Sequence, residues 1–125
     1  MEKYDCIIIG GGIAGITAGI YLKNANKNVL LIEKGAMGGI LNKISKIENY
    51  PGFKSIMGPD LAYNLYEQAK YNEIEILEET VIGIENKEDE NIVKLKDKEL
   101  SCKYLILATG KEARRLNLEN EEELL

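Results

Sequence analysis

Uninterrupted apolar runs mark the positions where this 125-residue chain is expected to form buried strands. The runs at residues 4–9, 29–32 and 104–108 do not alternate with polar side chains, which is typical of parallel strands covered on both faces. A shorter apolar stretch at residues 74–77 predicts one more strand of the same kind. Together these segments predict a parallel β-sheet.

Helical spacing appears between the predicted strands. Residues 13–24 place apolar or small side chains three and four positions apart, which predicts a helix that packs on the sheet. Residues 60–71 show the same spacing, and Pro59 suits the first turn of that helix. Strands joined by such helices form an α/β fold with right-handed crossovers.

Two further segments depart from this alternation of strands and helices. In residues 79–102 apolar positions alternate with short polar turns, which predicts a small antiparallel β-meander inserted into the parallel fold. Residues 34–59 are predicted to form a long loop that carries five of the twelve glycines. A loop of this length in a compact domain is usually a functional one.

Composition and charge narrow the function classes. The chain is 45% hydrophobic and 30% charged, which indicates one globular domain over residues 1–125. Its net charge of -5 argues against nucleic-acid binding, which needs a basic face. No apolar run approaches the ~20 residues of a membrane span, and a predicted strand follows the N-terminus directly. We therefore expect a cytoplasmic protein with neither nucleic acid nor membrane as a partner.

The chain offers few groups for catalysis or metal binding. It has no histidine, and its two cysteines, Cys6 and Cys102, are far apart in the sequence. They form neither a C-x-x-C pair nor a zinc-binding spacing, and a free cysteine usually behaves as a small buried hydrophobe. The sequence therefore predicts no catalytic residue and no metal site.

A glycine motif stands where the first predicted strand meets the first predicted helix. Gly10, Gly12 and Gly15 form a Gly-x-Gly-x-x-Gly pattern. The first glycine permits a tight turn, the second lets the backbone approach a pyrophosphate, and the third lets the helix pack closely on the strand. The N-terminus of the helix adds unpaired N–H groups and a partial positive charge. The motif therefore predicts a dinucleotide site.

Two other predicted strands end in residues that suit the same site. Glu33 ends the second strand, 23 positions after Gly10, where a carboxylate accepts hydrogen bonds from ribose hydroxyls and disfavours the 2′-phosphate of NADP. The last strand ends at Ala108-Thr109-Gly110. Ligands of open α/β sheets bind outside the carboxyl ends of the strands, so we expect these ends to gather there.

Five motifs in one order resemble a known family. They are Gly10–Gly15, Glu33-Lys34, Met37-Gly38-Gly39, Glu48-Asn49-Tyr50-Pro51-Gly52 and Ala108-Thr109-Gly110. The set resembles the N-terminal FAD-binding part of thioredoxin reductase and its low-molecular-weight relatives. The resemblance extends from about Tyr4 to about Glu122 and implies a Rossmann-like FAD-binding domain.

The resemblance also implies a role for each candidate residue toward FAD. The residues that would hold the pyrophosphate are Gly10, Gly12, Ile13, Ala14 and Gly15. Those that would hold the adenosine ribose are Glu33 and Lys34. Those that would run past the ribityl chain and the flavin are Gly38, Gly39, Ile40 and Leu41. Asn49 would reach the isoalloxazine, and the backbone of Val81 would pair with adenine. The segment that would close the site is Ala108, Thr109 and Gly110.

The chain departs from the family pattern in two ways. Ile40 stands where the family usually has a glutamine, so a hydrogen bond to the flavin is lost or supplied otherwise. The chain also carries neither the NAD(P)H domain with its C-x-x-C nor the strand that returns to the FAD domain. We therefore expect a partial FAD-binding domain that is incomplete as an enzyme by itself. A thioredoxin-like protein would be a partner only through the full-length parent.

The missing strand would leave Tyr104–Ala108 at an open edge of the sheet. An open edge of this kind invites pairing, so we expect self-association or a complementing chain there. Two alternatives to the flavoprotein reading are a stand-alone dinucleotide-binding module without catalysis and an NAD-binding Rossmann domain of a dehydrogenase. The Gly38-Gly39 loop and the meander disfavour the NAD-binding domain, because such a domain alternates strands and helices.

Overall fold

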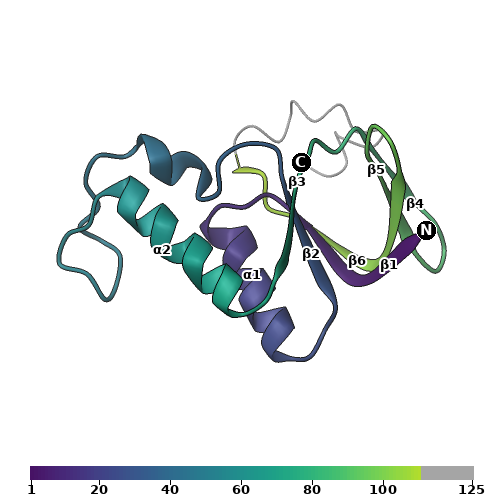
Figure 1. Ribbon diagram of the computed structural model, residues 1–125, viewed down its shortest axis with the longest axis horizontal. Coiled ribbons are helices and arrows are strands. Elements are labelled where there is room, and N and C mark those ends of the chain that lie inside the picture. Colours follow the sequence, from purple (N-terminus) through teal and green to yellow (C-terminus); the bar gives the residue numbers. More distant parts are fainter. Residues whose placement is uncertain (111–125) are drawn as a thin grey trace.

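The computed structural model describes residues 1–110, in which two α-helices pack against one six-stranded sheet (Figure 1). The strands stand in the order β3-β2-β1-β6-β5-β4. Their bounds are β1 Glu2–Ile9, β2 Val29–Glu33, β3 Glu75–Glu78, β4 Gly83–Asn86, β5 Asn91–Lys94 and β6 Glu99–Leu107. The helices are α1 Ile13–Asn24, α2 Gly58–Tyr71 and the short 3-10 helix η1 Gly39–Lys43. The α/β class expected from the apolar runs is confirmed.

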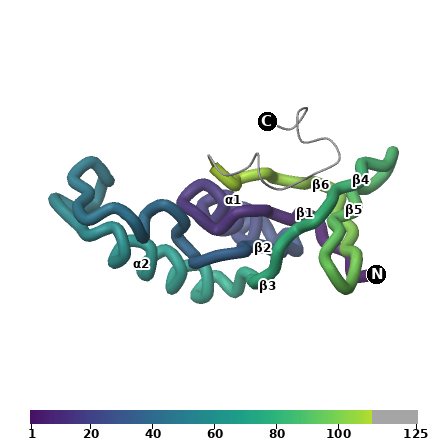
Figure 2. Tube along the Cα trace, turned by 90° about the horizontal axis from the view of Figure 1, so that it is seen from above, coloured from purple at the N-terminus to yellow at the C-terminus, as the bar shows by residue number. Residues whose placement is uncertain are grey.

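Strand β1 lies at the centre of the parallel part of the sheet. It pairs in parallel with β2 on one side and with β6 on the other, and β2 pairs in parallel with β3. Figure 2 shows β6, β1 and β2 in this order. The side chains of Ile7 and Ile8 point to opposite faces of the sheet, and both are fully buried. This two-sided burial explains why the sequence of β1 shows no alternation.

Helices α1 and α2 cover one face of the sheet, on the left of the strands in Figure 1. Ile16 of α1 and Leu61 and Leu65 of α2 pack with Ile8 and Leu31 in one buried cluster. Each such side chain contributes about 1.5–3 kcal/mol when fully buried, so this face supplies a large part of the stability. Pro59 lies in the first turn of α2, as its sequence predicts.

The antiparallel strands β4 and β5 cover the opposite face, on the right in Figure 1. Ile84 and Val93 from these strands pack with Ile7, Ile9 and Leu30 in the second buried cluster. The pairing of β4 with β5 and of β5 with the first half of β6 is antiparallel. The predicted antiparallel meander is thereby confirmed, and its side chains cover one face of the parallel strands.

The structure corrects several predicted boundaries. The last arm of the meander and the predicted strand at residues 104–108 are one continuous strand, β6, which pairs with β1 from Leu100 to Leu107. Its first half also pairs with β5, so its two halves have different neighbours and different sequence patterns. The predicted loop at residues 34–59 contains η1 and a bridge between Ile47 and Ile56. The N-terminal strand begins at Glu2 rather than at residue 4.

The second half of β6 has one neighbouring strand within residues 1–110. Its pairing with β5 ends at Cys102, whereas its pairing with β1 continues to Leu107. Tyr104 in this half is 61% exposed. In the part of the chain that the structure describes, the outer edge of this half-strand is therefore unpaired, as expected for Tyr104–Ala108. None of the helices described there is both long and apolar enough to cross a bilayer.

Candidate functional site

Hydrogen bonds join the carboxyl ends of three parallel strands. The N–H of Gly10, directly after β1, donates to the carbonyl of Ile32 in β2 at 2.8 Å. The N–H of Ala108, directly after β6, donates to the carbonyl of Ile9 at 2.8 Å. The structure thus brings the glycine turn, the end of β2 and the Ala108-Thr109-Gly110 segment to one edge of the sheet.

Close packing around the first turn requires glycine. Gly10 has a φ of 117°, and a Cβ there would lie 2.2 Å from the carbonyl oxygen of Ala108. A Cβ at Gly15 would lie 1.9 Å from the carbonyl oxygen of Gly10. The turn is therefore held between β6 and α1, and neither glycine tolerates a side chain.

The N-terminus of α1 presents N–H groups without a capping side chain. The N–H of Ile16 makes the first intrahelical bond, to the carbonyl of Gly12 at 3.0 Å. The preceding N–H groups of the first turn have no intrahelical acceptor, and no acidic residue lies in this turn. A Cβ on Gly12 would approach nothing closer than the carbonyl oxygen of Gly38 at 4.0 Å, so open space lies in front of it. This arrangement can bind an anion through the main chain.

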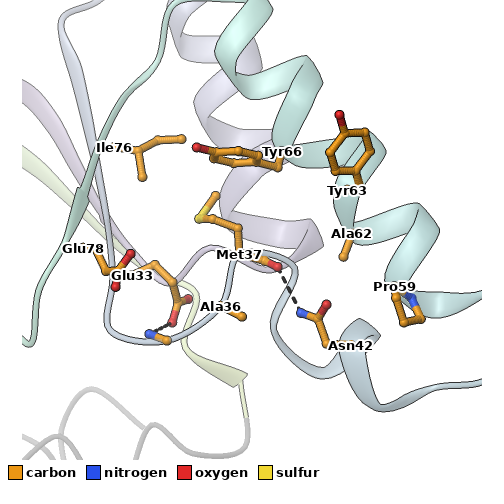
Figure 3. Close-up of a pocket in the computed structure, with 11 residues that line it drawn as sticks. Glu33, Ala36, Met37, Asn42, Pro59, Ala62, Tyr63, Tyr66, Ile76 and Glu78 are labelled. Atoms are coloured by element: carbon orange, nitrogen blue, oxygen red, sulfur yellow. Dashed lines mark hydrogen bonds between the residues drawn. The ribbon is translucent and has the colours of Figure 1, made fainter.

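Glu33 links two turns of the site through its carboxylate. One oxygen accepts a hydrogen bond from the N–H of Gly11 at 2.7 Å, and the other accepts from the N–H of Gly35 at 2.7 Å. The second of these bonds is drawn in Figure 3. A carboxylate offers about four acceptor positions, so both oxygens retain capacity for a hydroxyl donor. Lys34 follows with an exposed side chain.

The Gly38-Gly39 turn is fastened to the glycine turn after β1. The N–H of Gly38 donates to the carbonyl of Gly11 at 2.7 Å. The amide of Asn42 donates to the carbonyls of Met37 and Gly39 at 3.0 and 3.2 Å. Gly38 and Gly39 have φ angles of 96° and 57°, which favour glycine. These hydrogen bonds hold the Gly38-Gly39 turn next to the glycine turn that precedes α1.

The two residues after this turn have opposite exposures. Ile40 is 67% exposed, whereas Leu41 is 4% exposed and packs in the helix-side core. Only the main chain of Leu41 is therefore available to a ligand. Ile40 therefore presents a large apolar side chain at the surface beside the Gly38-Gly39 turn.

The other predicted site residues lie around this centre. The side chain of Val81 is 2% exposed and belongs to the meander-side core, which leaves only its main chain for contact with adenine. Asn49 is exposed in the segment between Ile47 and Ile56, which Figure 1 shows beyond the start of α2 and away from the strand ends. The structure does not bring Asn49 to the glycine turn. Thr109 is half-buried.

The sequence analysis missed three residues that shape the site. Gly11 and Gly35 donate their N–H groups to Glu33, and Asn42 fastens the Gly38-Gly39 turn. Main-chain donors leave no mark in a side-chain pattern, so the two glycines were recognisable only as members of glycine-rich turns. Asn42 carried a usable signal, because asparagine near a turn commonly bonds to nearby carbonyls.

Both cysteines are free thiols buried in the core. Burial raises the pKa of the Cys6 thiol to about 11, and burial also raises the pKa of the Cys102 thiol. The two belong to different core clusters on opposite faces of the sheet. Both cysteines are therefore small buried core residues, as the sequence predicts.

Comparison with known proteins identifies the family. A sequence profile of the family described as pyridine nucleotide-disulphide oxidoreductase matches residues 4–125. The chain belongs to this family. The resemblance to the N-terminal part of thioredoxin reductases is confirmed as well.

The similar proteins are much longer than this chain. It is 43% identical over 122 residues to thioredoxin reductase of Ureaplasma parvum, a match that covers 98% of this chain and 40% of the relative. It is 38% identical to thioredoxin reductase of Bacillus subtilis, with 97% and 38% covered. The chain therefore spans about two-fifths of the length of these curated relatives.

Solved structures agree with the sequence matches. Thioredoxin reductase of Lactococcus lactis has a TM-score of 0.85 at 40% identity, with 97% of this chain and 40% of that chain covered. A ferredoxin-flavin thioredoxin reductase from Clostridium acetobutylicum has a TM-score of 0.83 at 34% identity, with 88% and 38% covered. The cofactor assigned to the family, FAD, is the one expected from the sequence.

The geometry of the described residues fits this cofactor. A diphosphate needs main-chain donors and an approach free of side chains, and the start of α1 beside Gly12 provides both. An adenosine ribose needs an acceptor near the end of β2, and the carboxylate of Glu33 lies there.

Proposed function

We propose that this chain binds FAD across the carboxyl ends of β1, β2 and β6, as the flavin-carrying part of a thioredoxin-reductase-like disulfide oxidoreductase. The observation that carries the proposal is the uncapped start of α1, which faces open space at Gly12 within a site fastened by Glu33. Bound flavin would supply the capacity to accept electrons from a reductant and pass them to a disulfide.

Each part of the cofactor has a proposed place. The pyrophosphate contacts the main chain of Gly10–Gly15, and the ribose hydroxyls donate to Glu33, with Lys34 beside it. Adenine contacts the backbone of Val81, while the ribityl chain and flavin pass Gly38–Leu41 and reach Asn49. The Ala108-Thr109-Gly110 segment closes the site, and the hydrogen bond from the N–H of Ala108 to the carbonyl of Ile9, next to the glycine turn, supports that position.

The electron acceptor in this proposal is a dithiol outside this chain. The only two cysteines here are 96 positions apart and buried on opposite faces of the sheet, so they cannot form a redox-active pair without unfolding. The match covers about two-fifths of each curated relative, so the dithiol and a pyridine-nucleotide domain are proposed to belong to the rest of the full-length parent. A thioredoxin-like protein would be the final acceptor for the full-length parent. The cytoplasmic location stays a prediction.

The unpaired edge of Tyr104–Ala108 is proposed as the place where further polypeptide adds to the sheet, either from a complementing chain or from a second copy. A groove of about 350 Å³ runs beside this edge, and Cys6, Leu22 and Ile106 are among its lining residues. A mostly apolar groove beside an unpaired strand suits a packed polypeptide segment better than water, and Asp5 and Lys27 are the charged residues that line it. Multi-angle light scattering of the 125-residue chain tests self-association, which a monomer at every concentration would rule out.

A ligand titration tests the proposed cofactor. The purified chain, freed of endogenous ligand, is titrated with FAD, FMN and NAD while flavin fluorescence or protein amide shifts are followed. FAD is expected to bind at least about tenfold more tightly than FMN, because FMN lacks the adenosine and the diphosphate bridge that Glu33 and the start of α1 recognise. Preference for NAD would favour the dehydrogenase alternative instead. Absence of binding by all three nucleotides would contradict the proposal.

A further inference from the structure

The Gly38-Gly39 turn has to keep one conformation if the flavin half of FAD is to pass along it. Glycine loses more conformational freedom on ordering than any other residue, so two glycines in succession are costly to hold in place. Both have positive φ angles, 96° and 57°. Since neither has a side chain that could anchor the turn, other groups must fix its conformation.

Main-chain contacts fix the first glycine of the turn. The N–H of Gly38 donates to the carbonyl of Gly11 at 2.7 Å. A Cβ on Gly38 would lie 2.3 Å from the Cβ of Ala62, so the main chain packs closely against the start of α2. The N–H of Gly39 donates to the carbonyl of Ala36 at 3.2 Å, which is a longer bond. The second glycine is therefore held less firmly by the main chain alone.

The side chain of Asn42 spans the turn and adds the missing restraint. Its amide nitrogen donates to the carbonyl of Met37 at 3.0 Å and to the carbonyl of Gly39 at 3.2 Å. Figure 3 draws the first of these bonds. Both partners are acceptors, and a primary amide has two N–H bonds to donate. Leu41, directly before Asn42, is 4% exposed and packs in the helix-side core, so the tether starts from an anchored residue.

We propose that Asn42 is a positioning residue for the flavin half of FAD. This inference rests on the proposed function, in which the ribityl chain and the flavin pass Gly38–Leu41. The side chain of Asn42 acts through the main chain of Met37 and Gly39, which it holds in the receiving conformation before the cofactor binds. A turn that is ordered in advance does not have to be ordered at binding, so the flavin half contributes more to the affinity. The adenosine and the diphosphate are assigned to other residues, which the Asn42 side chain does not contact.

The test compares FAD with ADP, which has the adenosine and a diphosphate but lacks the ribityl chain and the flavin. Asn42→Ala removes both side-chain hydrogen bonds without adding a charge. The variant is expected to bind FAD about fivefold or more weakly than the parent and to bind ADP within about twofold of the parental affinity. Flavin fluorescence measures the first affinity, and titration calorimetry measures the second. Equal weakening of both ligands, or an unchanged affinity for FAD, would overturn the proposal.

Asn72→Ala is the matched control. The amide nitrogen of Asn72 donates to the carbonyl of Gln68 at 2.8 Å, so this variant loses the same kind of exposed hydrogen bond. Asn72 follows the last residue of α2, whereas Gly38 packs near the start of that helix. The control should bind FAD and ADP within about twofold of the parent. A loss of FAD affinity as large as that of Asn42→Ala would indicate a general effect on stability and would count against the proposal.

Hydrogen exchange of the ligand-free chain gives a second readout. Without the Asn42 tether, the Gly38 amide should exchange about fivefold or more faster, because the turn opens more often. The Gly10 amide, which bonds to the carbonyl of Ile32 at 2.8 Å, should exchange as in the parent. Unchanged exchange at Gly38 would overturn the proposal. If the parent did not bind FAD, the proposed function would fail together with this inference, whereas equal FAD binding by the parent and Asn42→Ala would refute this inference alone.

Discussion

Replacement of Gly12 by alanine separates the FAD site from the stability of the fold. Gly12 has a φ of -83° and a ψ of -165°, an extended conformation that alanine also adopts. The added Cβ would be 4.0 Å from its nearest neighbour, the carbonyl oxygen of Gly38. Because the methyl group meets no clash and no strained backbone, the free energy of unfolding should change by less than about 1 kcal/mol.

The same methyl group should nevertheless weaken FAD binding. It occupies the space in front of the first turn of α1, where the pyrophosphate is proposed to contact the main chain. Adding one carbon to a filled contact costs about 1–3 kcal/mol, which corresponds to a rise in Kd of about 5- to 150-fold. Urea unfolding measures the stability, and a fluorescence titration with FAD measures the affinity.

Gly83→Ala is the matched control. The added Cβ would lie 3.5 Å from the side chain of Lys94, an ordinary contact in β4. This variant should bind FAD with the parental affinity. The reasoning is refuted if folded Gly12→Ala binds FAD within twofold of the parent, or if both variants lose affinity equally.

Three further predictions follow from the hydrogen bonds and from the buried ionisable groups. Glu33→Gln leaves one of two main-chain donors unpaired, so it should lower the unfolding free energy by about 1 kcal/mol and speed amide exchange at Gly11 or Gly35. Burial and the hydrogen bonds to two glutamates raise the pKa of Tyr4. The free energy of unfolding should therefore fall as the pH rises above about 10, because only the unfolded tyrosine ionises there. In urea titrations at several pH values, Tyr4→Phe should make this fall shallower. Burial raises the pKa of Cys6 to about 11, so a thiol reagent at pH 8 should react with it far more slowly in the native protein than in urea.

The parallel sheet was predictable because its buried strands are uninterrupted apolar runs in the sequence. β2 and the second half of β1 are apolar on both faces, Gly10 follows β1 and Glu33 ends β2, so the carboxyl ends of both strands were predictable. Those ends carry Gly10 and Glu33, and the structure brings them together through a hydrogen bond at 2.8 Å between the turn and β2. The centre of the site was therefore derivable from pattern alone.

The continuity of β6 could not be derived in the same way. Residues 99–102 are enclosed between β5 and β1, whereas residues 103–107 pair with β1 alone among the described residues. The charged Lys103 interrupts the apolar pattern and suggests a break between two strands that the backbone does not make. The sequence pattern reflects how each side chain is buried. A single strand such as β6 can change from two neighbouring strands to one along its length, so its pattern changes although the strand is continuous.

The hydrogen bonds that hold the two glycine turns together could not be predicted from the sequence. The bond from the N–H of Gly38 to the carbonyl of Gly11 joins two loops through main-chain atoms, which any residue type possesses.

The central place of β1 has a consequence for synthesis on the ribosome. β1 is made before the other described strands, yet one of its two neighbours, β6, begins at Glu99. At about 5–20 residues per second, the nascent chain keeps one side of β1 without this partner for roughly 5–20 seconds. During this interval β1 is a natural target for chaperones, and slower translation upstream of Glu99 would lengthen its exposure to aggregation.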